Sequence, residues 1–277
     1  MPSHATPKTS GQQAELAWRP GRLGISSASA QNQKGSVGKT TTAANLAVLV
    51  ARQHRRVLVI DSDPQFALTR QLGAEERSLG VNLVDVLAGR AAAADAIVPG
   101  IHGVDLIAAA PALAGVEMSL VGELGRERFL IDALEPLIAQ YDDIVLDTPP
   151  NLGLLTVNAL VAAEVVIAPV SAEDDASLHG IRELRQTLGK LTDRLSAPSP
   201  ALMPVLTRWQ PLRISGRLIE QALLVESLQP AVRVPARSAL FAAAAAARVP
   251  LAITAPDSAP ILAYDLLAER ITEAIAR

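Results

Sequence analysis

The sequence predicts an α/β fold with a doubly wound, mostly parallel sheet flanked by helices. Strand-like apolar runs alternate with helix-like segments, two of these runs end in aspartate, and one helix-like segment follows a glycine-rich turn. A length of 277 residues with 49% hydrophobic composition is sufficient for a large buried sheet. We therefore expect one domain over residues 21–277, preceded by a polar, disordered extension over residues 1–20.

The predicted strands are short and rich in β-branched residues. Residues 56–60 are almost entirely apolar, which is typical of a parallel strand buried on both faces. Three serines make the first strand unusually polar. In chain order, the predicted strands are residues 22–30, 56–60, 104–108, 144–147, 165–170 and 201–206.

Helical segments separate these strands. The stretch 113–140 is interrupted near Gly122 and Gly125, and two prolines directly after Thr148 prevent a helix there. The alanine tracts 91–94 and 242–247 indicate good helix formers rather than linkers. The predicted helices are residues 41–49, 113–140, 152–162, 177–195, 214–227 and 260–276.

Residues 32–41, Asn-Gln-Lys-Gly-Ser-Val-Gly-Lys-Thr-Thr, predict a phosphate-binding loop. Gly35 and Gly38 allow backbone N–H groups to approach an anion at a helix N-terminus, where the helix dipole favours negative charge. Lys39 places a positive charge near the β- and γ-phosphates, and Thr40 offers a hydroxyl to Mg²⁺. The residues predicted to bind nucleotide here are Lys34, Gly35, Ser36, Val37, Gly38, Lys39, Thr40 and Thr41.

This loop departs from the ordinary pattern G-x-x-x-x-G-K-[ST] in two ways. Gln33 occupies the first glycine position, and Lys34 adds a second cation. Ser36 would cost roughly 1 kcal/mol more than glycine if its backbone needs a positive φ. We expect weakened but not abolished nucleotide binding.

Carboxylates end two predicted strands, at the sheet edge where open α/β folds bind ligands. Asp147 has the position of a carboxylate that holds Mg²⁺ through water, and Asp61 is a second candidate to support Mg²⁺. Asp63 precedes Pro64, so a purely structural role, in a turn at a strand end, is the alternative to a catalytic role for this residue.

The loop, together with the runs at 57–65 and 141–160, resembles the ParA/MinD family of deviant Walker-type ATPases, whose signature is K-G-G-x-G-K-[ST]-T. Ser36 replaces the second glycine of that signature. The Asn-Gln lead-in looks most like a short, Soj-like ParA partitioning protein, and the resemblance covers roughly residues 22–277.

This resemblance implies ATP and Mg²⁺ as cofactors and a slow ATPase with Lys34, Lys39 and Asp63 as catalytic residues. Lys34 would cross a dimer interface to the partner's nucleotide, and Asp63 would orient the attacking water. It also implies an ATP-dependent homodimer that binds double-stranded DNA non-specifically, with a ParB-like activator that stimulates hydrolysis and releases it. Such a protein would segregate chromosome or plasmid DNA on the nucleoid, in the cytoplasm.

The net charge of −3 hides a local excess of cations. Residues 176–217 carry seven cations against two acids, a local charge of +5 that leaves about −8 elsewhere. This excess indicates a nucleic-acid face or, equally, a solvated basic surface. The candidate DNA contacts are Arg208, Arg213, Arg217 and Arg237, and surface ion pairs are the alternative for each. By resemblance, adenine lies near Thr207, Arg208 and Pro235, although Trp209-Gln210-Pro211 departs from the family there.

Other functions on this scaffold remain open. A MinD-like protein would need a basic amphipathic C-terminal helix, but residues 260–276 carry more acids than bases, so we expect no membrane partner. A dethiobiotin-synthetase-like ligase or a bacterial tyrosine kinase is a third class, although only Tyr141 and Tyr264 are present. Zero cysteines exclude relatives that hold an iron–sulfur cluster. A non-catalytic binding module would be favoured only if Ser36 disables the loop.

Overall fold

A single eight-stranded sheet forms the centre of the protein. The structure is a computed structural model of the 277-residue chain, and it describes residues 22–25, 37–75, 80–195 and 198–275. The strand order is β3-β4-β2-β5-β1-β6-β7-β8, and β3 is the one antiparallel strand among those described. This confirms the predicted doubly wound, mostly parallel fold class. The strands are β1 (Arg22–Ile25), β2 (Val57–Asp61), β3 (Ile97–Ile101), β4 (Val104–Ile107), β5 (Asp143–Asp147), β6 (Val165–Ser171), β7 (Ala201–Trp209) and β8 (Val232–Pro235).

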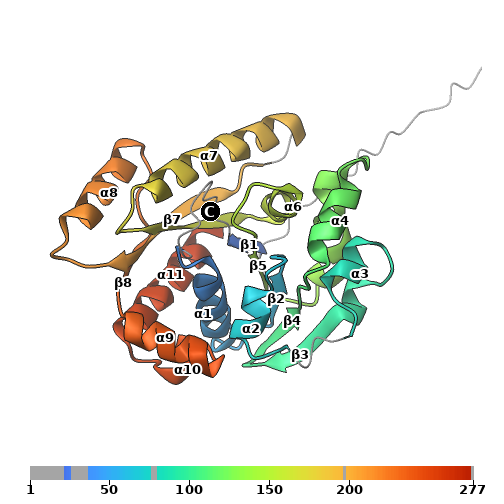
Figure 1. Cartoon of the computed structure of the whole chain (residues 1–277), viewed down its shortest axis with the longest axis horizontal. Helices are drawn as coiled ribbons and strands as arrows, with labels where there is room; N and C mark the ends of the chain where they lie inside the picture. The colour runs from blue at the N-terminus through green and yellow to red at the C-terminus, as the bar shows by residue number, and fades with distance from the viewer. Residues whose placement is uncertain (1–21, 26–36, 76–79, 196–197, 276–277) are drawn as a thin grey trace, which may run out of the picture.

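Helices cover both faces of this sheet (Figure 1). One face packs against α1, α2, α9, α10 and α11, and the other against α3 to α8. They are α1 (Lys39–Ala51), α2 (Ala67–Gln71), α3 (Leu83–Leu87), α4 (Leu113–Leu120), α5 (Phe129–Ile138), α6 (Leu154–Ala162), α7 (Ala176–Leu195), α8 (Ile214–Val225), α9 (Ser238–Ala247), α10 (Leu251–Thr254) and α11 (Ala259–Ile275), with 3₁₀ turns η2 (Ala93–Ala96) and η3 (Arg126–Arg128).

Strand β2 shows why the central strands contain so few polar residues. Val57 and Val59 belong to the apolar cluster on the α1 face, whereas Leu58 and Ile60 belong to the cluster on the α5 and α6 face. All four side chains are buried. Because alternate side chains of a strand point to opposite faces, a strand covered on both sides has no solvent-facing position.

Two edge strands were not predicted from the sequence. β3 contains Pro99 and Gly100, and β8 is four residues long and ends at Pro235. Proline and glycine weaken strand patterns but are tolerated at sheet edges, where ladder hydrogen bonds are missing on one side. The alanine tract 242–247 is helical in α9 as predicted, whereas only part of the tract 91–94 lies in a 3₁₀ turn.

The order of the strands places a topological switch point at the middle of the sheet. β1 lies between β5 and β6, and the chain leaves β1 through α1 to β2 on one side, while β6, β7 and β8 extend the other side. Open α/β sheets bind ligands at such a switch point, outside the carboxyl ends of the strands. The N-terminus of α1 lies there, together with the strand ends that carry Asp61, Asp147 and Thr207.

Candidate functional site

Helix α1 begins with geometry suited to an anion. Its N-cap, Gly38, has φ 94° and ψ 22°, a left-handed conformation that side chains disfavour. Within the described residues, α1 has no side-chain cap and no acid in its first turn. The first-turn N–H groups therefore carry the partial positive charge that phosphate-binding helices use.

A hydroxyl on β7 fastens the end of the predicted loop. Thr207 Oγ1 donates a hydrogen bond to the Val37 carbonyl oxygen at 2.8 Å, so Val37, at the end of the predicted loop, is held against β7. The remaining predicted loop positions, Lys34, Gly35 and Ser36, lie outside the described residues, as does the predicted extension over residues 1–20.

Lys39 is a buried cation among carboxylates. The residue as a whole is only 7% exposed. Burial lowers the pKa of Lys39, while the charges of Asp147 and Asp63 oppose this shift. An ammonium group with little water around it interacts strongly with an incoming anion, because the surroundings screen the charge poorly.

Asp147 is a buried carboxylate at the end of β5. It is 0% exposed, and within the described residues neither carboxylate oxygen has a hydrogen-bond partner of ordinary geometry. Burial, followed by the charge of Asp61, raises the pKa of Asp147 to about 8, while Thr40 and Lys39 act in the opposite direction. A buried carboxylate without donors is costly unless a cation or a proton compensates it. Asp147 and Thr40 therefore fit a magnesium site.

Asp61 lies opposite Asp147 in the register of β2 and β5, but its oxygens are already engaged. Oδ2 accepts hydrogen bonds from the Thr69 amide and hydroxyl, both at 2.8 Å, and Oδ1 accepts one from the Asp63 amide at 3.2 Å. Burial raises the pKa of Asp61 to about 6, although these hydrogen bonds oppose the shift. Asp61 thus anchors the segment after β2, and its contact with Mg²⁺ stays a prediction.

Asp63 lies in that anchored segment. Its Oδ1 accepts a hydrogen bond from the Gln65 amide at 2.9 Å. Asp63 therefore forms a turn at the strand end, which was the purely structural alternative for this residue. It is also 8% exposed and its charge acts on Lys39, which places it at the candidate site. Ser62 joins the two strand ends, because its hydroxyl and amide both donate to the Asp147 carbonyl, at 2.6 and 2.9 Å. The sequence analysis missed this role of Ser62.

The segment after Asp147 is held from the side by α4. Glu117 Oε1 accepts a hydrogen bond from the Leu155 amide at 3.2 Å, at the start of α6. A Cβ added to Gly153 would lie 2.4 Å from the same oxygen, so this contact leaves no room beyond glycine unless Glu117 moves. No sequence motif indicated Glu117, because the contact joins residues 38 positions apart.

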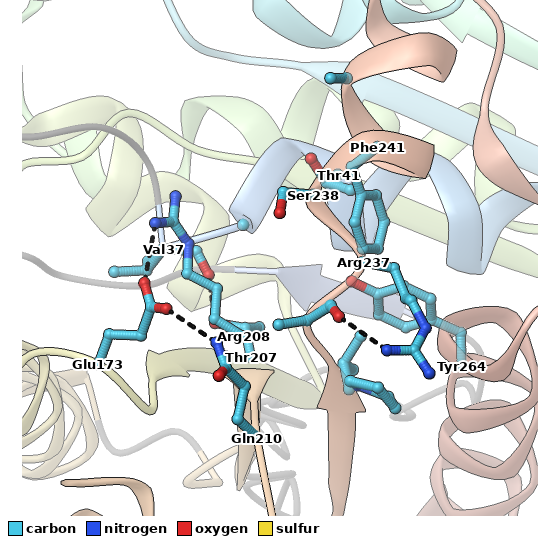
Figure 2. Close-up of a pocket in the computed structure, with 15 residues that line it drawn as sticks. Val37, Thr41, Glu173, Thr207, Arg208, Gln210, Arg237, Ser238, Phe241 and Tyr264 are labelled. Atoms are coloured by element: carbon cyan, nitrogen blue, oxygen red, sulfur yellow. Dashed lines mark hydrogen bonds and ion pairs between the residues drawn. The ribbon is translucent and has the colours of Figure 1, made fainter. Parts of the chain in front are cut away.

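A cavity of about 370 Å³ lies on the other side of the α1 N-terminus (Figure 2). Gly38 and Thr41 form one wall, and the predicted base-site residues Thr207, Arg208 and Pro235 form another. Figure 2 shows side chains from the β6–α7 and β7–α8 connections, from α9 and from α11 around the same space. The structure thus brings all three predicted base-site residues to one cavity next to the phosphate-binding turn.

Three of the four candidate DNA contacts line this cavity or pair with a residue that lines it, and all four have partners. Arg208 and Arg237 line it, Arg208 and Arg213 form ion pairs with Glu173, and Arg217 donates to a backbone carbonyl of the β7–α8 connection. The surface ion pairs raised as an alternative are therefore present for two of the four.

A helix N-terminus with a buried lysine, near a buried carboxylate at a strand end, defines a P-loop type of nucleotide-binding site. Residues 26–198 match the family model AAA_31, described as an AAA domain. The chain belongs to this family, and it is a ParA-like ATPase.

Individual relatives agree with this assignment. The chain is 36% identical to an uncharacterized protein of Mycobacterium tuberculosis over 87% of this chain and 77% of that protein. It is 43% identical to the sporulation initiation inhibitor protein Soj of Bacillus subtilis, over 57% of this chain and 62% of Soj. Among solved structures, cobyrinic acid a,c-diamide synthase of Mycobacterium smegmatis with bound ATP analog and magnesium is 30% identical, with a TM-score of 0.78 over 92% of this chain and 95% of that one.

Proposed function

We propose that the protein is a ParA-type partitioning ATPase. ATP binding forms a sandwich dimer that binds double-stranded DNA non-specifically, and hydrolysis, slow alone and stimulated by a ParB-like partner, releases the DNA. The observation that carries the ATPase part is the buried Asp147 near the N-terminus of α1, whose carboxylate oxygens make no hydrogen bond of ordinary geometry within the described residues. The partitioning part is supported by relatives such as the chromosome partitioning protein ParA of Myxococcus xanthus, which is 42% identical over 158 residues.

The cofactors are ATP and Mg²⁺, and the residues present fit both. Thr40 and Asp147, which interact with each other, would hold the metal with Asp61 behind them, and bound Mg²⁺ would neutralise charge on the β- and γ-phosphates. Such ions are held by one or two carboxylates with phosphates and water. The base occupies the cavity beside Thr207 and Pro235.

In this function, Lys39 contacts the phosphates, and Lys34 reaches the partner's nucleotide. Asp63 orients the attacking water, because phosphoryl transfer needs positioning more than covalent chemistry. The residues that contact DNA are Arg208, Arg213, Arg217 and Arg237. The protein acts on the nucleoid, in the cytoplasm. No helix in the described ranges has both the length and the apolar character to cross a membrane.

Asp63→Ala tests the hydrolytic role. We expect this variant to bind ATP with Mg²⁺ but to lose turnover, measured by phosphate release and calorimetry. Asp193→Ala, which removes an exposed carboxylate of α7, is the matched control and should behave like wild type. Unchanged hydrolysis in Asp63→Ala would exclude the assigned role.

Electrophoretic shift of random-sequence duplex DNA tests the partitioning role. We expect a shift that requires ATP, weakens steeply with salt and is lost in Arg237→Ala. Sedimentation with anionic liposomes in place of a DNA shift would instead support a MinD-like protein.

A second candidate function follows from one comparison. The Mycobacterium smegmatis synthase is 30% identical along almost the whole chain, so an ATP-dependent amidation of a carboxylic acid is an alternative use of the site. ATP hydrolysis that depends on cobyrinic acid and an ammonia donor, and not on DNA, would support this alternative.

A further inference from the structure

Glu173 connects the cavity to the arginines that surround it. It follows β6 in the connection to α7, and its side chain lines the cavity beside Gly38 and Thr207. Its amide donates to Ser171 Oγ at 3.3 Å, which fixes the backbone where the carboxylate enters the cavity. None of the roles assigned above uses Glu173.

The carboxylate of Glu173 holds three side chains, one at the end of β7 and two in the β7–α8 connection. Oε2 lies 3.3 Å from Arg208 Nη1, and Oε1 lies 3.1 Å from Arg213 Nη1 and 3.5 Å from Gln210 Nε2. Figure 2 shows Glu173 between Arg208 and Gln210 at the rim of the cavity. One acid therefore engages two of the four arginines assigned to DNA.

These ion pairs are exchangeable. The side chains of Glu173, Arg208 and Arg213 are 28%, 51% and 53% exposed, and pairs of this kind contribute only about 0–1 kcal/mol each. A carboxylate and a phosphate can each accept two hydrogen bonds from one planar guanidinium group. A DNA phosphate and the Glu173 carboxylate are thus alternative partners for the same arginines.

The cavity supplies a reason for the exchange to depend on nucleotide. An ionised carboxylate only accepts hydrogen bonds, whereas adenosine carries an amino group and ribose hydroxyls that donate them. A nucleotide in the cavity therefore offers Glu173 new donors on the side away from the arginines. Arg208 has a left-handed backbone, with φ 53°, at a point where the β7–β8 register shifts, so the end of β7 that carries it is strained.

We propose that Glu173 is an internal competitor for DNA phosphate, which occupies Arg208 and Arg213 while the cavity is empty and releases them when nucleotide enters. This proposal rests on the partitioning function, since it explains how ATP and DNA affinity are linked. It adds a charge-based step within one protomer to the dimerisation proposed above.

Glu173→Gln is the direct test, since it keeps the shape of the side chain and removes its charge. Without nucleotide, we expect this variant to bind random-sequence duplex DNA about tenfold more tightly than wild type at 50 mM salt. The slope of log affinity against log salt should become steeper by about 2, because each neutralised phosphate contributes about 0.9. Adding ATP should then increase affinity less than it does for wild type.

Two further variants separate this proposal from a general charge effect. Glu75→Gln changes the net charge equally and frees Arg248 at the far end of α9, so its DNA affinity should stay at the wild-type value. Arg213→Ala in the Glu173→Gln background should remove most of the gain. An equal gain in Glu75→Gln, or no gain in Glu173→Gln, would overturn the proposal.

The outcomes also distinguish this proposal from the function on which it rests. If ATP-loaded wild type binds DNA through these arginines but Glu173→Gln is unchanged, the competitor role alone is wrong. If no variant binds DNA with or without ATP, the partitioning function and the competitor role both fall.

Discussion

The carboxyl edge of the sheet has a buried acidic half and an exposed basic half. At the ends of β2 and β5, Asp61 and Asp147 are both 0% exposed, and Lys39 is nearly so. Beyond β6, the side chains of Glu173 and Arg208 keep 28% and 51% of their surface exposed. Both halves adjoin the N-terminus of α1, yet their charges are in very different surroundings.

This difference decides which physical effect controls each half. In the buried half, loss of hydration dominates, so the pKa values of Asp61 and Asp147 rise and a cation is needed to compensate them. In the exposed half, water screens the charges and the ion pairs are weak. The buried half is therefore suited to holding a magnesium nucleotide, and the exposed half to exchanging partners.

The largest effect should come from Lys39→Ala. A buried ammonium bonded to phosphate loses charge-assisted hydrogen bonds of about 1.5–3 kcal/mol each, so ATP affinity should fall by about 100-fold or more. Calorimetric titration with ATP and Mg²⁺ measures this loss. Lys190→Ala removes an exposed lysine of α7 and should leave ATP affinity unchanged. Tight ATP binding by Lys39→Ala would show that the buried half does not bind the phosphates.

A smaller effect should appear in the stability of Asp147→Asn without nucleotide. Because the pKa of Asp147 is raised to about 8, the folded chain keeps a proton that the unfolded chain releases above about pH 4. The free energy of unfolding of wild type therefore falls as pH rises from about 4 to about 8. Asp147→Asn removes this penalty and should be more stable than wild type by about 2–4 kcal/mol at pH 8, with little difference near pH 4.

Urea unfolding of both proteins across this pH range measures the difference. Asp193→Asn, on the exposed surface of α7, should follow wild type at every pH. Parallel pH profiles for wild type and Asp147→Asn would mean that the carboxylate is compensated in the free protein.

Sequence reasoning succeeded where the chemistry is local. The apolar run ending at Asp147 predicted β5 because a strand covered on both faces excludes polar residues, and the glycine-rich turn before Lys39 predicted that a helix, α1, follows it. The pocket residues Thr207 and Pro235 came from family resemblance alone, and the structure places them in one cavity.

The remaining features depend on contacts between distant positions. Glu173 faces Arg208 and Arg213 only because β6 and β7 are neighbours in the sheet. Glu117 reaches the start of α6 in the same way. Exposed glutamates and arginines occur throughout the chain, so no local pattern distinguishes these pairs from solvated charges.

The smallest predicted effect tests one wall of the cavity, where Tyr264 of α11 meets Thr42 of α1. Their hydroxyl oxygens are 3.1 Å apart in a buried contact, and Tyr264 also lines the cavity. Tyr264→Phe should lower the free energy of unfolding by about 1 kcal/mol, because it removes one buried hydrogen bond without leaving a void. Tyr141→Phe, which removes a half-buried hydrogen bond to Asp105 on the surface, is the control and should cost less.

A double-mutant cycle sharpens this test. If the two hydroxyls depend on each other, Thr42→Val combined with Tyr264→Phe should cost less than the sum of the single changes, since no buried polar group is left without a partner. Strictly additive costs would mean that each hydroxyl finds another partner. The contact would then contribute nothing to holding α11 against α1, and the cavity wall would depend on apolar packing alone.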